Sequence, residues 1–339
     1  MAHTTDTATP SLDRFFETVH GFHRTAVIKT AIELDVFSLI AEGCKTADAL
    51  AERCRAAPRG MRILCDQLTV IGFLSKIDGD YTLASDAELF LTKRSPAYVG
   101  TAIDFLLSDA QMEPFRALTS AVRQGGTAME TSVVAPDHPV WVAFARAMAP
   151  LMMFPSELLA QLIASDPAPI RKVVDVAAGH GLYGIAIAKR NPDAQIVAVD
   201  WPNVLDVAVE NARAAGLADR YTTLPGSAFD VEYGRDCDLI LLTNFLHHFD
   251  PSGCEAVLRK CAAALQPGGR VAILEFIPNE DRVTPPIAAS FSLMMLATTP
   301  RGDAYTFAQY AEMLRRVGFS ANALHDLPPT YFRAVIARK

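Results

Sequence analysis

From residue 171 onward, the chain alternates short apolar runs with segments whose apolar residues have helical spacing. The apolar runs predict strands at "KVVDVAAG", "QIVAVDW", "CDLILLTNF" and "RVAILEF", with closing strands at "ANALHDL" and "YFRAVIARK". The segments between them predict helices at "YGIAIAKRN", "NVLDVAVENARAAG", "GCEAVLRKCAAAL" and "FAQYAEMLRRVGF". Because continuously apolar strands are buried on both faces, this alternation predicts a parallel sheet covered by helices on both sides. Folds of this class bind ligands at the carboxyl ends of their strands.

Residues 12 to about 110 have a different pattern, with helices and one short β element. Thr46 is placed to cap a helix in "TADALAERC", and "APRGMRILCDQLTVIGFL" predicts a second helix after a turn. Asp78 and Gly79 in "SKIDGDYTLA" predict a hairpin turn. Helix, turn, helix and hairpin in this order are typical of a winged helix. We therefore expect a mainly α, winged-helix-like domain over residues 1–110.

Residues 111–166 predict a helical linker, most apolar at "HPVWVAFARAMAPLMMFPSELLAQLIA". Pro155 lies inside this segment and is expected to break or kink the helix. The stretch "SDPAPI" has the composition of a connection between domains and precedes the α/β domain, residues 167–339. The expected fold class is α/β, with an N-terminal winged-helix domain followed in the sequence by a Rossmann-like C-terminal domain.

Composition and charge limit the classes of binding partner and the cellular compartment that we expect for this protein. The formal net charge is 31 − 38 = −7, which disfavours a general binder of nucleic acids or anionic membranes. Residues 1–100 hold 11 Lys and Arg against 13 Asp and Glu, so the winged helix lacks a basic footprint and is interpreted as a dimerisation module. The N-terminus does not have the pattern of a signal peptide, and apolar runs such as "IAASFSLMMLA" fall short of a membrane span. Six cysteines without CxxC or zinc-ligand spacing indicate a reduced, cytoplasmic protein.

A glycine loop follows the first strand of the α/β domain. Gly179, Gly181 and Gly184 form a G-x-G-x-x-G, and Asp200 follows Gly181 by 19 residues. Both facts are typical of a dinucleotide site, but a site for S-adenosylmethionine (SAM) also needs glycines for close backbone approach and a carboxylate for the ribose.

Three features favour SAM. Asp175 lies in the strand before the loop, where a carboxylate suits the ammonium group of SAM and would repel a pyrophosphate. The stretch "LQPGGRVAILE" places a Pro-Gly-Gly turn before a strand, as many SAM methyltransferases do. About 155 residues follow the loop, which is room for one α/β domain and not for a second catalytic domain.

These motifs resemble the class I SAM-dependent small-molecule O-methyltransferases, the family of the plant caffeate and flavonoid enzymes and of bacterial polyketide-tailoring enzymes. The resemblance covers nearly the whole chain and implies a homodimer formed through the N-terminal domain. "DVAAGHG" matches the family's loop, with Ala177 where a glycine is usual. "VDWPNV" implies that Asp200 holds the ribose hydroxyls and that Trp201 packs near the adenine, while Ser227 in "GSAF" replaces a usual aspartate. The implied cofactor-binding residues are Asp175, Ala177, Gly179, Gly181, Asp200, Trp201, Ser227, Ala228, Phe229 and Thr243, the last where the plant enzymes have a lysine.

Two adjacent histidines, His247 and His248, follow the strand "DLILLTNF". The residues alone leave open a metal site, an acid/base pair, or one working residue beside a bystander. Adjacent residues at a strand end point in different directions and no third ligand lies at helical spacing, so no metal is expected. A neutral histidine, with a pKa near 6.5, is a usable base for a phenol, with a pKa near 10.

The family resemblance assigns roles to these residues. It implies that His247 is the general base and that Glu275 in "VAILEF" orients it, while His248 replaces an aspartate. The family's second glutamate corresponds to Ala304 in "PRGDAYT", with Asp303 beside it, so the second acid is absent or shifted.

Methionines and phenylalanines are dense in two segments that the family places against the methyl acceptor, "ARAMAPLMMF" and "FSLMMLA". Methionine adapts to irregular shapes and contacts aromatic faces well, which favours a flat, largely apolar acceptor. The expected acceptor-site residues are Met148, Met152, Phe291 and Met295.

The expected function is SAM-dependent methyl transfer to a hydroxyl of a small aromatic metabolite. One alternative is methylation at carbon or nitrogen, or a SAM-binding relative that transfers no methyl group; Ala304 and His248 motivate it. The alternative from another class is a metabolite-sensing DNA-binding regulator, which the charge of residues 1–100 disfavours.

Overall fold

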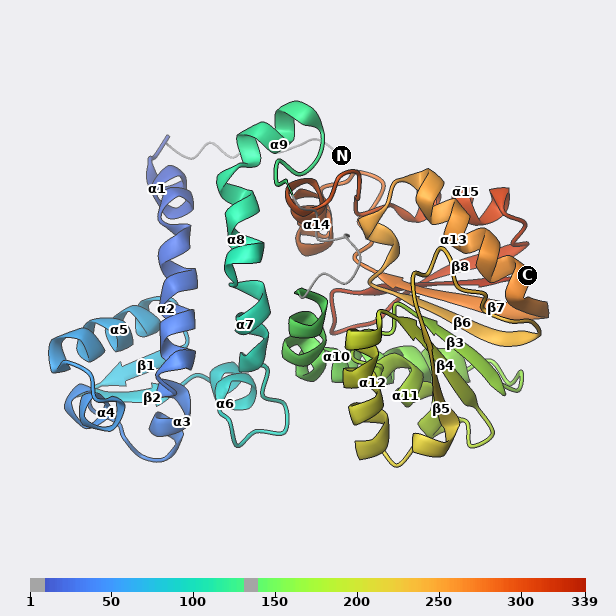
Figure 1. The fold of residues 1–339 in the computed structure, drawn as a ribbon. Coiled ribbons are helices and arrows are strands. Elements are labelled where there is room, and N and C mark those ends of the chain that lie inside the picture. The colour runs from blue at the N-terminus through green and yellow to red at the C-terminus, as the bar shows by residue number, and fades with distance from the viewer. Residues whose placement is uncertain (1–9, 131–139) are drawn as a thin grey trace. The chain divides into compact units, whose positions relative to one another are not determined.

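The structure is a computed structural model that describes residues 10–130 and 140–339 (Figure 1). The chain forms two compact units, one ending at Ile103 and the other beginning at Asp104. The first nine residues of the predicted N-terminal domain, and His138 and Pro139 at the start of the predicted apolar helix, lie outside the described residues.

The N-terminal unit is mainly helical and carries one β hairpin (Figure 1). Its elements are α1 (Asp13–Val19), α2 (Gly21–Glu33), α3 (Val36–Ala41), α4 (Ala47–Cys54), α5 (Pro58–Val70), β1 (Leu74–Ile77), β2 (Asp80–Leu83), α6 (Ser85–Leu91) and the 3-10 turn η1 (Gly100–Ala102). As predicted, the Thr46 side chain caps α4 by accepting the Ala49 N–H at 3.3 Å. Asp78 and Gly79 both have positive φ, which matches the twist of a two-residue hairpin turn.

One carboxylate ties the hairpin of this unit to α5. Asp66 accepts hydrogen bonds from Tyr81 Oη at 2.7 Å and from Lys76 Nζ at 2.6 Å, and it also pairs with Arg62 at 2.9 Å. The bonds from Lys76 and Tyr81 hold the pKa of Asp66 down at about 2. The cations of α5 and the hairpin are therefore partly neutralised within the unit.

The second unit is built on a seven-stranded sheet with helices on both faces (Figure 1). Its strands are β3 (Lys172–Val176), β4 (Gln195–Asp200), β5 (Tyr221–Pro225), β6 (Cys237–Thr243), β7 (Leu265–Glu275), β8 (Ala321–Asp326) and β9 (Arg333–Arg338). Its helices are α7 (Ile103–Leu106, at the boundary), α8 (Asp109–Arg116), α9 (Leu118–Gln124), α10 (Val140–Ala164), α11 (Leu182–Arg190), α12 (Pro202–Ala214), α13 (Pro251–Ala264), α14 (Pro286–Thr298) and α15 (Phe307–Arg316), with 3-10 turns η2 (Ala218–Arg220) and η3 (Leu246–His248).

The strand order is β5-β4-β3-β6-β7-β9-β8. The first five strands run parallel, but β9 is antiparallel to both β7 and β8. The expectation of a wholly parallel sheet is therefore wrong for β9, which runs opposite to the other strands, because only the short stretch 327–332 joins β8 to β9 and a parallel pair needs a long crossover. Strand β5, which the sequence pattern did not predict, lies at the sheet edge with mostly exposed or half-buried residues.

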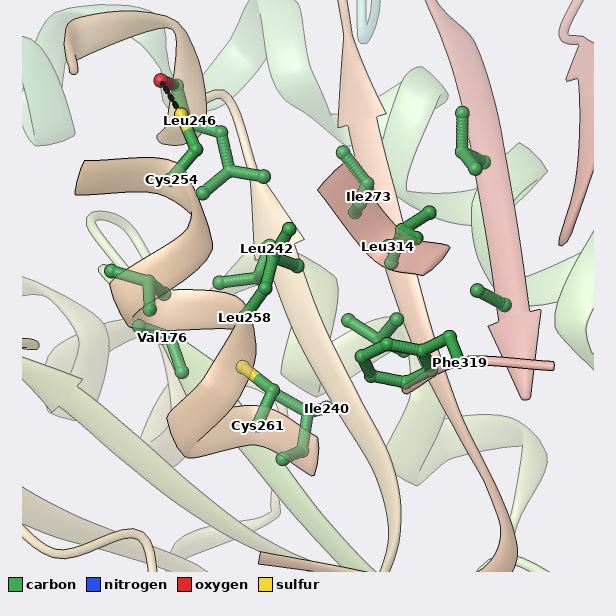
Figure 2. Close-up of a cluster of buried hydrophobic side chains, with 14 of the residues drawn as sticks. Val176, Ile240, Leu242, Leu246, Cys254, Leu258, Cys261, Ile273, Leu314 and Phe319 are labelled. Carbon is green, nitrogen blue, oxygen red and sulfur yellow. Dashed lines mark hydrogen bonds between the residues drawn. The ribbon is translucent and has the colours of Figure 1, made fainter. Parts of the chain in front are cut away.

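Helices α13 and α15 cover one face of the sheet. Figure 2 shows the interface, where Val176, Ile240 and Leu242 of the strands meet Cys254, Leu258 and Cys261 of α13. All of these side chains are fully buried, and burying an aliphatic side chain of this size stabilises a fold by about 1.5–3 kcal/mol. The six cysteines are free thiols, and Cys254 Sγ donates to the Leu246 carbonyl at 3.2 Å, which fixes α13 against the turn after β6.

Helix α10 packs with α11 and α12 and runs without a break from Val140 to Ala164, through Pro150 and Pro155. The predicted break at Pro155 does not occur. The helix is also long and apolar enough to cross a membrane, contrary to the expectation that every apolar run is too short. It is a core helix: its apolar face is buried, and Arg146 pairs with Glu210 of α12 at 2.9 Å.

Candidate active site

A cavity of about 250 Å³ opens at the carboxyl ends of β3, β4 and β6. It lies where the strand order reverses between β3 and β6, the usual ligand position in open α/β sheets. Eight of the ten predicted cofactor-binding residues line it, namely Ala177, Gly179, Asp200, Trp201, Ser227, Ala228, Phe229 and Thr243. The sheet topology therefore brings together residues that lie far apart in the sequence, because β3 ends at Val176 and its neighbour β6 ends at Thr243.

The glycine loop and the end of β4 are tied to each other by Asp200. One carboxylate oxygen accepts the Gly179 N–H at 2.8 Å and the other accepts the Trp201 N–H at 2.7 Å. Burial raises the pKa of Asp200 to about 6, and these two hydrogen bonds oppose the rise. Ala177 and Gly179 both have φ near 55°, so Ala177 holds a left-handed conformation at the position where a glycine is usual.

Asp175 and Gly181 do not line the cavity. The Asp175 carboxylate accepts the Gly184 N–H at 3.0 Å in the first turn of α11, and its Oδ1 has no hydrogen-bond partner among the described residues. Burial raises the pKa of Asp175 to about 7. Gly181 is required by close packing, because a Cβ there would lie 2.5 Å from Tyr221 Oη and 3.0 Å from Ala208 Cβ. These two residues support the loop from beneath.

His247 and Glu275 form a buried pair at the ends of β6 and β7. The strand β6 ends at Thr243, and His247 lies on the turn η3 rather than on the strand itself. His247 Nδ1 lies 2.5 Å from Glu275 Oε2, and Glu275 Oε1 accepts the N–H groups of Phe245 and His247 at 2.9 and 3.4 Å. Both side chains are at most 6% exposed. The predicted orientation of His247 by Glu275 thus has a matching geometry.

This geometry suits one tautomer of His247. With Glu275 as a carboxylate, which can only accept hydrogen bonds, the proton of a neutral His247 ring is assigned to Nδ1. Nε2 is then left with a free lone pair. Such a nitrogen can take a proton from a neighbouring hydroxyl group.

The position of the predicted second acid has no carboxylate directed at the base. Ala304 is buried. The Asp303 carboxylate pairs with Arg282 at 2.5 Å and also accepts the Ala304 N–H. Glu275 is the carboxylate that contacts the His247 ring within residues 140–339.

His248 and Asn244 line the cavity, although the sequence analysis assigned them no cofactor contact. Asn244 has a φ of 54°, an uncommon conformation that recurs at functional sites. Asn244 Oδ1 and His248 Nδ1 are buried polar atoms without a hydrogen-bond partner among the described residues. Burial, with His247 beside it, lowers the pKa of His248 well below its usual range, so this imidazole is neutral. The His248 ring lies edge-on to the rings of Trp141 and His247, with ring centroids 5.1 Å and 4.2 Å away, respectively.

Helix α10, the middle of the glycine loop and the start of α11 add aromatic residues that the sequence pattern did not predict. Trp141, Phe144, His180 and Tyr183 all line the cavity. His180 Nδ1 accepts the Leu182 N–H at 3.2 Å, and burial lowers the pKa of His180 to about 4. Its place between Gly179 and Gly181 was the available signal for a cavity residue.

The predicted acceptor-site residues do not line this cavity. Met148, Met152 and Met295 are at most 6% exposed, and Met152 Sδ accepts the Tyr183 hydroxyl at 3.5 Å. Phe291 is different, because its ring contacts the His247 ring edge-on at 4.8 Å and stacks on Phe276 at 4.2 Å. Phe291 therefore joins an aromatic cluster that contacts the histidine.

A doubly wound sheet with a glycine loop, a carboxylate on the second strand and a cavity at the switch point defines an enzyme that binds a nucleoside-containing cofactor. Comparisons with known proteins narrow this class. The O-methyltransferase domain family matches residues 120–320, and the O-methyltransferase dimerisation domain family matches residues 16–93.

Relatives agree with these matches. The chain is 31% identical to 3-hydroxy-5-methyl-1-naphthoate 3-O-methyltransferase of Streptomyces sahachiroi, over 88% of this chain and 87% of that protein. It is 27% identical to acetylserotonin O-methyltransferase of Mus musculus, over 94% of this chain and 86% of that protein. A crystal structure from Nostoc punctiforme, provisionally described as an O-methyltransferase, is 52% identical and superposes with a TM-score of 0.95 over 98% of this chain and 100% of that one.

The chain therefore belongs to the O-methyltransferase family, as an enzyme that uses SAM to methylate small metabolites. The resemblance stated from the sequence is confirmed, as is the fold class, with its N-terminal dimerisation domain and Rossmann-like C-terminal domain.

Proposed function

We propose that this enzyme transfers the methyl group of SAM to a hydroxyl of a small aromatic metabolite, with His247 as general base. One observation carries the proposal: His247 Nδ1 lies 2.5 Å from Glu275 at the end of the sheet where the cavity opens. The His248 ring contacts the base on one side and lines the cavity on the other. The base and the cofactor site are thus adjacent.

The residues of the cavity fit SAM. Asp200 presents a carboxylate that suits the ribose hydroxyls, while Trp201 and Phe229 present flat apolar surfaces that suit the adenine. The partnerless Asn244 Oδ1 and His248 Nδ1 are polar atoms that a cofactor with a polar methionyl end would satisfy. When bound, SAM supplies a methyl group that its sulfonium already activates for displacement.

The protein must then hold the acceptor oxygen near that methyl group and remove its proton. Glu275 keeps the proton of His247 on Nδ1, so Nε2 accepts the proton of the acceptor hydroxyl. As the imidazolium forms, its charge is stabilised by the buried Glu275 carboxylate. The same contact fixes the ring plane, because Glu275 is itself held by the N–H groups of Phe245 and His247.

The surroundings of His247 favour an aromatic acceptor. Phe291 contacts the base, and Phe276 stacks on Phe291 and contacts Phe332 at 4.6 Å. Aromatic rings pack well against such clusters, in edge-on or offset geometry. A phenolic hydroxyl also ionises more readily than an alcohol, which suits a histidine base. The relative from Streptomyces sahachiroi is named for a hydroxynaphthoate, which supports this class.

We expect the enzyme to be a cytoplasmic homodimer joined through the N-terminal unit. Helices α1 and α2, with Leu12 just before α1, carry large apolar side chains that are 49–68% exposed, namely Leu12, Phe15, Phe16, Val19 and Phe22. Apolar side chains gathered in this way mark interaction surfaces. Light scattering should give twice the chain mass of 36.7 kDa, and Phe15→Asp/Phe22→Asp should shift the mass toward the monomer. A monomeric wild type at micromolar concentration would refute this arrangement.

SAM affinity should depend on pH through Asp200. The ribose hydroxyls need the ionised carboxylate as acceptor, and burial raises the pKa of Asp200 to about 6. The carboxylate is therefore ionised at pH 7 and mostly protonated at pH 5. Because apparent affinity scales with the competent fraction, the Kd for SAM should rise about tenfold from pH 7 to pH 5. Calorimetry across this range measures it, and Asp200→Asn should flatten the profile. A wild-type Kd that is flat across the range would argue against the ribose assignment.

The proposal is tested by a screen of SAM with a labelled methyl group against naphthols, hydroxybenzoates and catechols, and against matched aliphatic alcohols, amines and thiols. We expect turnover with aromatic hydroxyls and not with the aliphatic alcohols. Turnover confined to amines, thiols or aliphatic alcohols would overturn the proposed acceptor class.

A further inference from the structure

A turn between α14 and α15 lies directly against the backbone of the two histidines. This turn is Thr299–Asp303, with the sequence "TPRGD". The Asp303 N–H donates to the carbonyl oxygen of His247 at 3.0 Å. Arg301 pairs at 3.2 Å with Asp250, which caps α13 just after the histidines. The turn therefore contacts the base-bearing segment at more than one point.

Gly302 makes the closest of these contacts. A Cβ built on Gly302 would overlap the carbonyl oxygen of His247 and would lie 3.1 Å from the carbonyl carbon of His248. The φ of Gly302 is outside the left-handed region, so an alanine could adopt its backbone conformation. Close approach to the His247 carbonyl and to the Thr299 hydroxyl, whose oxygen would lie 2.6 Å from that Cβ, is what requires a glycine here, and not backbone strain.

The turn is itself fixed from within the domain. Thr299 is fully buried, and its hydroxyl accepts the Gly302 N–H at 2.8 Å and donates to the Met295 carbonyl of α14 at 2.7 Å. On the other side, Arg282 pairs with the Asp303 carboxylate and donates to Gln309 of α15 at 2.9 Å. The turn is thus a rigid surface on which the main chain of His247 rests.

We propose that the turn Thr299–Asp303 positions the base: it holds the main chain of His247 so that the imidazole stays bonded to Glu275. This inference rests on the proposed role of His247. The base lies on the three-residue turn η3, which Glu275 holds from the sheet side through N–H groups. The turn Thr299–Asp303 holds η3 from the other side, through the hydrogen bond of the Asp303 N–H to the His247 carbonyl. Gly302 and Thr299 are therefore positioning residues for the reaction.

The test compares substitutions that differ by single groups. Thr299→Val keeps the shape of the side chain and removes the hydroxyl, whereas Thr299→Ser keeps the hydroxyl. Gly302→Ala adds one methyl group against both the His247 carbonyl and the Thr299 hydroxyl. Gly60→Ala is the matched control, because a Cβ on Gly60 has no atom within 4 Å. Two readouts are taken: kcat with the fastest phenol of the screen, and the NMR signal of the His247 Nδ1–H, assigned by its loss in His247→Ala.

Since a displacement of about 1 Å can cost up to about 100-fold in rate, we expect Thr299→Val and Gly302→Ala to lower kcat at least about tenfold. The Kd for SAM should be unchanged, and the downfield Nδ1–H signal should shift or broaden. Thr299→Ser and Gly60→Ala should retain both the rate and the signal. If Gly302→Ala does not fold, the Thr299 pair decides the question.

Three outcomes would overturn the inference. If Thr299→Val keeps the wild-type kcat and Nδ1–H signal while His247→Ala loses activity, His247 is the base but the turn does not position it. If kcat falls as far in Thr299→Ser as in Thr299→Val, the loss of rate comes from altered packing rather than from the missing hydroxyl. If His247→Ala keeps wild-type kcat, the base assignment fails and the positioning role fails with it.

Discussion

His247→Ala is expected to lower kcat by at least about 100-fold while leaving the Kd for SAM nearly unchanged. The reason is the separation of roles in the structure. The His247 ring contacts Glu275, Phe291 and His248 and does not line the cavity, so its loss removes the proton acceptor without removing a cavity wall. Steady-state kinetics with a phenol acceptor and calorimetry with SAM measure the two quantities.

His325→Ala is the matched control for this substitution. His325 lies on the edge strand β8, away from the cavity lining, so its removal should leave both kcat and the Kd for SAM unchanged. Wild-type turnover in His247→Ala, with an intact control, would mean that another group or the acceptor itself disposes of the proton. The base assignment would then be wrong.

Asp200→Ala is expected to weaken SAM binding by about 10- to 100-fold, since hydrogen bonds to a charged group contribute about 1.5–3 kcal/mol each. Asp200 accepts the N–H groups of Gly179 and Trp201, so its removal also releases the glycine loop from the end of β4. Asp200→Asn keeps one amide oxygen as acceptor, so its Kd for SAM should lie between those of the wild type and Asp200→Ala. An unchanged Kd for SAM in Asp200→Ala, measured by calorimetry at pH 7, would contradict the placement of the cofactor.

The parallel strands of the sheet could be predicted because strands that are buried on both faces have continuous apolar sequences. Each of β3, β6 and the second half of β7 is a run of apolar residues. The starts of β3 and β6 were predicted correctly, but β7 begins at Leu265, five residues before the predicted strand, and includes the Pro-Gly-Gly that was expected to be a turn. Strand β5 was missed because it pairs with only one neighbour and keeps exposed residues, so its sequence lacks an apolar run. The antiparallel direction of β9 was missed, although the short connection to β8 carried the signal.

The predicted break at Pro155 does not occur, for a related reason. A proline removes one helical hydrogen bond, but α10 is held along its length by packing on α11 and α12, and that packing outweighs the local cost. Local propensity alone could not reveal this, because the compensating contacts come from residues more than 20 positions away.

The candidate site divides in the same way. Asp200 and Thr243, which the family resemblance implied for the cofactor site, line the cavity because the ends of parallel strands converge at one edge. The wall from α10, with Trp141 and Phe144, could not be placed, because helix packing is not encoded at fixed spacing. Asp175 shows the converse, since a polar residue in a strand suggested a ligand while its carboxylate in fact caps the first turn of α11. The contact of Asp175 with the cofactor stays a prediction.

The central claim is that this site delivers a methyl group to oxygen. The most direct measurement is the ¹³C NMR spectrum of the purified product made from SAM with a ¹³C-labelled methyl group and the fastest phenol of the screen. One labelled signal is expected, with the chemical shift of a methyl carbon bonded to oxygen, at the position of the former hydroxyl. A labelled methyl carbon bonded to a ring carbon or to nitrogen, with the hydroxyl intact, would contradict it.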